Sequence, residues 1–233
     1  MRRSPAAAAS RSASEARSRE EAETISECPA CGARLETPLG CLACGVLLRP
    51  ATVPTPFEVF GLDPSWRVDR SELKGRLRRL GRLTHPDHHG TSPAEIRALA
   101  EANAATMNGA YEVLLDDFLR ADWLVGHRGG PSTEDERQMP QEFLMDVLEW
   151  NEALDDAEGA AEGSPERARL DELARSLLTL HDERLAELGA RLEPLPPQGS
   201  PVLAEIRREL NAIRYLSRAL LRIRDLRFGS SSN

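Results

Sequence analysis

Four cysteines stand in the first fifth of the chain, and none follows them. They form two short repeats, Cys28-Pro-Ala-Cys31-Gly and Cys41-Leu-Ala-Cys44-Gly, with nine residues between Cys31 and Cys41. Each pair places two thiolates on one tight turn, and two such turns complete a tetrahedral shell of four sulfurs that suits Zn²⁺. Because a closed shell has no position for water, we expect a structural zinc site and not a catalytic one. Redox pairs, idle thiols, or iron in place of zinc are the alternatives.

The second group of residues that could do chemistry is His85-Pro86-Asp87, which follows a basic segment. Leucines at helical spacing predict a helix that begins at Asp69 or Ser71 and ends near Leu83. Between residues 66 and 84 the chain has seven basic and two acidic side chains, a local charge of +5 in a chain of net charge −8. The cations are Arg67, Arg70, Lys74, Arg76, Arg78, Arg79 and Arg82. A basic stripe that ends at a proline-fixed turn suits recognition of an acidic partner.

Two other interpretations of this loop are open. His85, His88 and His89 lie within five residues of sequence together with Asp87, which is a set of possible metal ligands. Adjacent histidines on a short turn cannot easily face one ion, which weakens that interpretation. The loop could also be a solvated connection beside a charged helix face.

The last part of the chain, residues 137–228, reads as three helices, at about 138–158, 165–188 and 201–226. At 100° per residue, Phe143, Val147, Trp150 and Leu154 form a narrow apolar stripe on the first of them. Leu144, Met145 and Leu148 fall outside this stripe, and Tyr215 falls opposite the core stripe of the third helix. These outer residues favour a partner surface, and a helix packed on two neighbours is the alternative.

Composition and the predicted helices define the organisation of the chain. With 40% hydrophobic, 29% charged and 4% aromatic residues, the chain is typical of a soluble protein with a modest core. The longest apolar run is far short of a membrane span, and the negative net charge argues against a nucleic-acid platform. We expect an all-α fold in four parts: a disordered tail at 1–24, a zinc module at 25–50, a helical domain at 53–128 and a three-helix bundle at 137–228.

The helical domain resembles a J-domain. The resemblance rests on His85-Pro86-Asp87, on the turn Phe57-Glu-Val-Phe-Gly-Leu62, and on Asn108-Gly-Ala-Tyr-Glu-Val-Leu114, which is similar to the family pattern N-x-A-Y-x-x-L. It implies a helical hairpin that docks on a DnaK-type chaperone and stimulates its ATP hydrolysis. The docking residues that it implies are His85, Pro86, Asp87, Lys74, Arg78, Arg79 and Arg82.

Within the J-domain class the chain looks like HscB, the co-chaperone of iron–sulfur cluster assembly. The segments that carry this resemblance are Leu119-Arg-Ala-Asp-Trp-Leu124, Gln141 to Leu154 and Ile213-Arg-Tyr-Leu216, together with an N-terminal four-cysteine module similar to that of animal-type members. In that family the bundle binds the iron–sulfur scaffold protein, which implies Leu144, Leu148 and Tyr215 as scaffold-binding residues. The chain departs from the family at His89, where an aromatic residue is usual, and at Gly75 and Gly81 in the basic helix.

The resulting expectation is a co-chaperone without enzymatic activity, because the sequence has no nucleophile with a paired base, no phosphate-binding glycine loop and no cofactor motif. Its partners would be a DnaK/HscA-type ATPase chaperone and an IscU-type scaffold protein, with no nucleic acid and no membrane. We expect a cytoplasmic location. The Arg- and Ser-rich start of the chain leaves the mitochondrial matrix as an alternative. The competing functions are a general J-domain co-chaperone with another client and a zinc-ribbon protein that binds nucleic acid.

Overall fold

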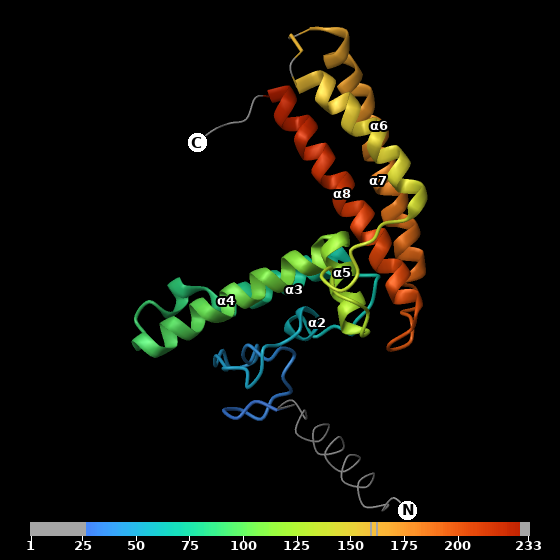
Figure 1. The fold of residues 1–233 in the computed structure, drawn as a ribbon. Coiled ribbons are helices and arrows are strands. Elements are labelled where there is room, and N and C mark those ends of the chain that lie inside the picture. Colours follow the sequence, from blue (N-terminus) through green and yellow to red (C-terminus); the bar gives the residue numbers. More distant parts are fainter. Residues whose placement is uncertain (1–26, 159, 162, 229–233) are drawn as a thin grey trace, which may run out of the picture. The chain divides into compact units, whose positions relative to one another are not determined.

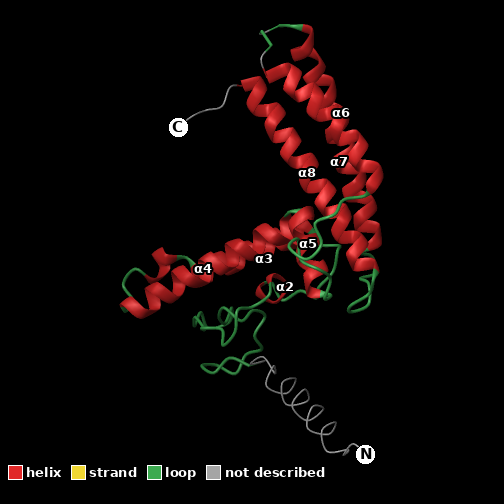
Figure 2. Cartoon of the chain, viewed as in Figure 1, coloured by secondary structure: helices red, strands yellow, loops and turns green. Residues whose placement is uncertain are grey.

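The computed structural model describes residues 27–158, 160–161 and 163–228. The predicted tail at 1–24 lies outside these residues. Within them every regular element is a helix, and the remaining chain forms turns and two isolated β-bridges, which confirms the expected all-α class (Figure 2). None of the described helices combines the length and the apolar character needed to cross a membrane.

The chain divides into two compact units. The first unit comprises residues 1–63 and 69–112, and the second comprises residues 64–68 and 113–233. The boundary on the C-terminal side falls inside helix α4, Ala94–Leu115. The domains predicted from the sequence, at 25–50, 53–128 and 137–228, differ from these two units. They remain a proposal about which parts of the chain have separate functions.

Helices α2, α3 and α4 form the helical part of the first unit. Helix α2, Pro56–Val59, begins with a reciprocal cap in which Thr55 accepts from the amide of Glu58 and donates its own amide to the Glu58 carboxylate. Helix α3, Arg70–Thr84, begins at the predicted Asp69, which accepts hydrogen bonds from the amides of Ser71 and Glu72. Helices α3 and α4 run side by side and are joined by a loop with one 3₁₀ turn, Pro86–His89 (Figure 1).

The core of this hairpin uses the predicted leucines. Its buried members are Phe57, Val59, Phe60, Leu73, Leu80, Leu83, Ala100, Met107 and Ala110. Arg76 ties α3 to the end of α2, since its guanidinium donates to the carbonyls of Phe60 at 2.6 Å and Gly61 at 3.0 Å. Arg76 thus has a structural role and differs from the exposed cations of the same helix. Ile96 is 37% exposed because it lies in the first turn of α4, one turn before the buried Ala100.

The second unit contains helices α5 (Asp117–His127), α6 (Gln141–Glu158), α7 (Pro165–Arg191) and α8 (Val202–Phe228). The last three run side by side as the predicted bundle (Figure 1). Their shared core is mainly leucine and alanine: Phe143, Val147, Leu154, Ala157, Leu170, Leu177, Ala212, Leu216, Ala219 and Ile223. Burial of these side chains from three helices supplies most of the driving force for folding this unit.

Buried arginines fix the irregular parts of the second unit. Arg120 is 5% exposed, lies 4.6 Å above the Trp66 ring, and donates to the carbonyls of Trp66 and Leu114. Arg207 of α8 pairs with Asp122 and donates to the carbonyl of Pro131. The arginine of the Leu119 to Leu124 motif therefore serves the fold, because its donors are used on two backbone oxygens and on the carboxylate of Asp117.

Candidate functional site

The four cysteines converge although the chain that carries them has no helix or strand. In each repeat the glycine after the second cysteine adopts a left-handed conformation, with φ of +71° at Gly32 and +79° at Gly45. The amides of Gly32 and Gly45 close the two turns on the carbonyls of Cys28 and Cys41, at 2.8 and 2.9 Å. We call residues 27–49 the four-cysteine segment.

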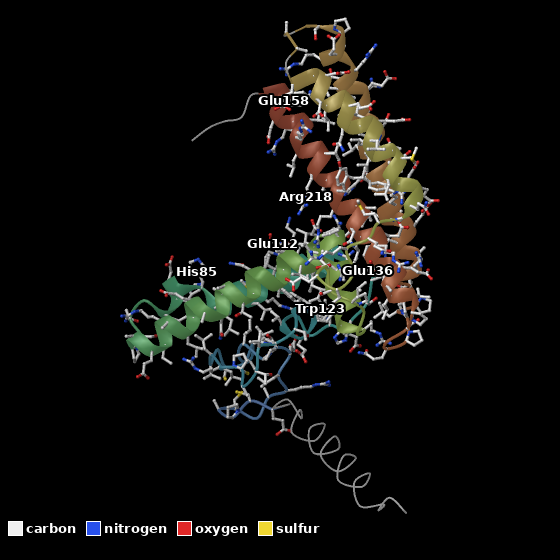
Figure 3. The ribbon with its side chains drawn as sticks, viewed as in Figure 1. His85, Glu112, Trp123, Glu136, Glu158 and Arg218 are labelled. Carbon is white, nitrogen blue, oxygen red and sulfur yellow. The ribbon has the colours of Figure 1, made fainter. Side chains whose placement is uncertain are left out.

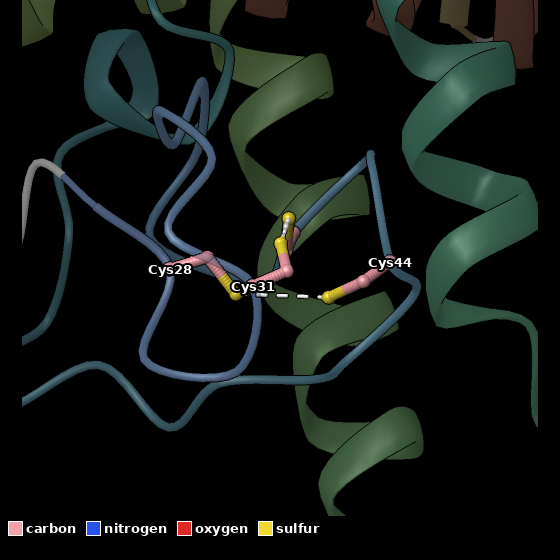
Figure 4. Close-up of side chains that lie close together, drawn as sticks. Cys28, Cys31 and Cys44 are labelled. Carbon is pink, nitrogen blue, oxygen red and sulfur yellow. Dashed lines mark hydrogen bonds between the residues drawn. The ribbon is translucent and has the colours of Figure 1, made fainter.

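The geometry of the sulfurs fits a tetrahedral metal. All four Sγ atoms lie within 4.8 Å of one another, and the Cys28–Cys44 and Cys31–Cys41 pairs are 3.6 and 3.7 Å apart (Figure 4). Four sulfurs about 2.3 Å from a Zn²⁺ ion would be separated by about 3.8 Å. Cys28 and Cys41 are buried and Cys31 and Cys44 are exposed, so one member of each pair faces inward. The residues therefore fit the predicted metal site.

The thiols of this site have shifted pKa values before any metal is considered. Hydrogen bonds from the amides of Cys44 and Ala43 to the Cys41 sulfur lower the pKa of Cys41 to about 7. The amide of Ala33 lowers the pKa of Cys31, but the neighbouring thiols, that of Cys44 most of all, together with partial desolvation outweigh it and raise that pKa to about 12. Amides directed at sulfur stabilise the thiolate form that a metal requires.

The His85 loop, residues 85–90, carries the predicted docking tripeptide at the end of α3 (Figure 3). The side chains of His85 and Asp87 are 56% and 88% exposed. The loop is ordered by local bonds: His85 Nδ1 accepts from the Asp87 amide at 3.2 Å, and His89 Nε2 lies 2.9 Å from the carbonyl oxygen of Leu83. These bonds fix the backbone of the loop, so the exposed Asp87 carboxylate projects from an ordered turn beside the end of the basic helix.

The four predicted docking cations are all exposed on α3. Lys74, Arg78 and Arg82 follow one another at intervals of four residues, so they share one face of the helix and lead toward His85. Arg79 lies on another face and forms an ion pair with Glu36 at 3.9 Å. The structure therefore brings three of the four cations together with the loop, and it gives Arg79 an additional contact with the four-cysteine segment.

The histidines of this loop do not assemble a metal site. Among the residues that the structure describes, the four cysteines form the one group of three or more metal-ligating side chains close enough to share an ion. His85 and His88 instead meet edge to face, with ring centroids 5.8 Å apart. Within the described residues, the geometry of this loop therefore does not support the metal-site interpretation.

The apolar residues that the helical wheel placed outside the core stripe of α6 are exposed. The exposed fractions are 45% for Leu144, 68% for Met145 and 60% for Leu148, whereas Phe143 and Leu154 are buried. Exposed apolar side chains on successive turns are typical of a surface that a partner covers. We call Leu144, Met145 and Leu148 the α6 apolar patch.

Tyr215 differs from the expectation that it lies opposite the core. It is half-buried beside α6: its ring meets Phe143 edge to face at 6.1 Å, and its hydroxyl exchanges hydrogen bonds with the Asn151 side chain at 2.9 and 3.1 Å. Asn151 follows Leu144 and Leu148 on the same face of α6, so Tyr215 borders the α6 apolar patch. Sequence reasoning did not identify Asn151, which has no distinctive motif.

Residues 139–224 match the family described as "HSCB C-terminal oligomerisation domain". The chain is 33% identical over 156 residues to the protein named "Co-chaperone protein HscB homolog" of Pseudoalteromonas atlantica, covering 66% of this chain and 87% of that one. The homologue of Vibrio vulnificus strain YJ016 is 31% identical over 174 residues, which is 74% of this chain and 88% of the relative.

Solved structures give the same result. The crystal structure of human co-chaperone protein HscB is similar, with a TM-score of 0.68 and 25% identity over 87% of this chain and 98% of that chain. HscB from Vibrio cholerae is similar with a TM-score of 0.57 and 27% identity, over 74% of this chain and 98% of that chain. The likeness includes both the hairpin that carries the His85 loop and the bundle that carries the α6 apolar patch. The chain belongs to the HscB family of co-chaperone proteins.

Proposed function

We propose that this co-chaperone delivers an IscU-type iron–sulfur scaffold protein to a DnaK/HscA-type chaperone and stimulates the ATPase of that chaperone. The observation that carries the proposal is the presence of two exposed recognition features on the two compact units. The basic face of α3 with the His85 loop is one, and the α6 apolar patch with Tyr215 is the other. The first suits an acidic groove and the second an apolar segment.

The role of the chain in this proposal is to bind and not to catalyse. His85, Pro86 and Asp87 with Lys74, Arg78, Arg79 and Arg82 would contact the chaperone, and Leu144, Leu148 and Tyr215 would contact the scaffold protein. Cys28, Cys31, Cys41 and Cys44 would hold a structural Zn²⁺, which supplies four bonds that fix the four-cysteine segment. Cysteines clustered at metal-ligand spacing, and not distributed as disulfides, favour a reducing compartment, so a cytoplasmic location stays our prediction.

The chaperone-docking part is tested by Asp87→Ala. Because the Asp87 carboxylate is exposed and does not support the core, the variant should fold normally, bind the scaffold protein as the wild type does, and fail to stimulate ATP hydrolysis. The measurement is steady-state ATPase of the chaperone with and without scaffold protein. Glu95→Ala, another exposed acid near the loop, is the matched control. Loss of both activities in Asp87→Ala would refute the two separate surfaces.

The scaffold-binding part is tested by Leu144→Ala combined with Leu148→Ala. Loss of two central apolar contacts should cost about 2 kcal/mol, roughly a 30-fold rise in Kd, measured by calorimetry. The control is Leu178→Ala, because Leu178 of α7 is a leucine of similar exposure, 54%. A double variant that binds the scaffold protein like the wild type would contradict the proposed scaffold-binding site. A double variant that unfolds would show that the two leucines belong to the core. Scaffold protein that does not bind the wild type at all would favour another client.

A further inference from the structure

A buried asparagine of α4 bonds the four-cysteine segment. Asn103 is 3% exposed, and its carboxamide nitrogen donates to the carbonyl oxygens of Leu39 at 2.8 Å and Leu48 at 3.0 Å. These two carbonyls lie on either side of the Cys41–Cys44 turn, and the amide of Leu48 also donates to the carbonyl of Leu39. Asn103 therefore fixes both chain segments that enter and leave the turn carrying two of the four cysteines.

The same turn packs against the end of α3. Leu47 and Leu83 are 8% exposed, and they cluster with the fully buried Ala100 of α4. The contact is close at Gly40, where a Cβ atom would lie 2.9 Å from Cδ2 of Leu83 and 2.7 Å from the carbonyl oxygen of Val46. Only glycine fits at this position without displacing one of them.

Leu83 connects this contact to the His85 loop. Its side chain packs on the four-cysteine segment, while its carbonyl oxygen lies 2.9 Å from Nε2 of His89, within hydrogen-bonding distance. His89 occupies the end of the 3₁₀ turn that begins with Pro86. A movement of the Cys41–Cys44 turn would therefore displace Leu83, whose carbonyl oxygen positions His89 of the His85 loop.

We infer that Asn103 is a positioning residue that couples the four-cysteine site to the His85 loop, so that metal binding and ordering of the loop stabilise each other. The inference rests on the proposed metal site and on the proposed role of the loop. Because coupling between two sites is reciprocal, loss of the Asn103 bonds lowers metal affinity, and loss of metal loosens the loop. Coupling between two sites in a protein typically changes the affinity of one site by about 5- to 150-fold, and here that affinity is the one for Zn²⁺.

The first measurement is the Zn²⁺ affinity of the full chain in competition with a chelator. Asn103→Asp replaces two N–H donors by a carboxylate that faces two carbonyl oxygens, and it should weaken Zn²⁺ binding at least fivefold. Asn108→Ala changes an exposed asparagine of the same helix and should leave the affinity unchanged. Asn103 does not contact the sulfurs. If Asn103 stabilised only the α3–α4 hairpin, its substitution would therefore leave the Zn²⁺ affinity unchanged. Equal affinity of Asn103→Asp and wild type overturns the inference.

The second measurement uses the wild-type chain and does not depend on the folding of a variant. Hydrogen exchange with and without Zn²⁺ should show faster exchange, in the metal-free chain, of the Thr84 amide at the end of α3 and of the His88 amide, which donates to the carbonyl of His85. Unchanged exchange at these amides on metal removal overturns the coupling. No chaperone is present in either measurement, so a failure of ATPase stimulation leaves the coupling standing. A chain that binds no Zn²⁺ overturns the metal site and the coupling together.

Discussion

The four-cysteine segment and the helices of the second unit are held in place by different kinds of interaction. Residues 27–49 form turns and bridges, and the largest side chains that they bury are the two leucines Leu39 and Leu47. The second unit buries a row of leucines between three helices of 18 to 27 residues. A short segment without a core of its own depends on cross-links, whereas long helices with apolar faces depend on burial.

This difference determines whether metal binding can change the order of the proposed binding surface on each unit. The first unit carries its proposed docking residues on the exposed face of α3 and on the His85 loop, next to the four-cysteine segment. The second unit carries them on a helix whose opposite face is locked by Phe143 and Leu154, both at most 1% exposed. A metal can therefore change the order of the first surface, and the second surface is preformed by packing.

The largest effect that separates the two units should come from metal removal. Chelation of the purified chain should abolish exchange protection of the amides of Cys28, Gly32, Cys41 and Gly45, because their turns lose the four metal–sulfur bonds. The three tryptophans, Trp66, Trp123 and Trp150, all lie in the second unit, so fluorescence reports that unit. We expect the fluorescence unfolding curve to be unchanged by the chelator. A large shift of that curve would show that the units do not differ in this way.

A substitution in the core of the bundle should have a smaller effect than metal removal and a larger effect than a substitution on the surface. Leu177 and Leu178 are neighbours on α7 that differ in exposure, 1% against 54%. Leu177→Ala should lower the free energy of unfolding of the second unit by about 2–5 kcal/mol through cavity formation, and Leu178→Ala by less than about 0.5 kcal/mol. Chemical unfolding followed by tryptophan fluorescence gives both values. Equal losses in the two variants would contradict the burial pattern.

Much of the fold was predictable because the sequence features that define a helix, its cap and its apolar periodicity, are local. The Asp69 cap, the leucine stripe of α3 and the split of α6 into buried Phe143 and exposed Leu144 all follow from residue type and helical spacing, and the structure confirms them. The convergence of the four cysteines was predictable for the same reason, since they lie in two short repeats whose spacing indicates a metal site without reference to the rest of the chain.

Tyr215 was misplaced because one helical wheel was applied to all of α8. The buried residues of the first half of this helix, Leu203, Ile206 and Leu210, point in a different direction from Ala219 and Ile223 in the second half, at about 100° per residue. Helix α8 packs on α5, α6 and α7 along its length, so the direction of the core turns along the helix. A single stripe direction cannot represent such a helix.

Asn103 was not predicted because its partners lie 64 and 55 residues away in the sequence. A lone polar residue on the apolar face of α4 was the available signal. Such a residue gives no indication of what it binds until the carbonyls of a distant turn are placed beside it. The same holds for Arg120, whose acceptors include Trp66, 54 residues away.

The smallest predicted effect concerns the approach to α6, where Glu136 binds α8. The amide of Gln138 donates to the Glu136 carboxylate, and with Arg208, which donates at 3.0 Å, it lowers the pKa of Glu136. Because the folded-state pKa lies below the unfolded value, the carboxylate adds stability above the unfolded pKa, and this stability is lost as the pH falls through the folded-state pKa.

Glu136→Gln keeps the shape of the side chain and removes its charge. The wild type should therefore be more stable than Glu136→Gln near pH 7, and the two should converge near pH 3, in urea unfolding monitored by tryptophan fluorescence. Glu142→Gln, an exposed acid in the first turn of α6, is the matched control. A difference between wild type and Glu136→Gln that stays the same from pH 7 to pH 3 would assign the role of Glu136 to packing. In that case the approach to α6, like the bundle itself, would be held by burial and not by charge.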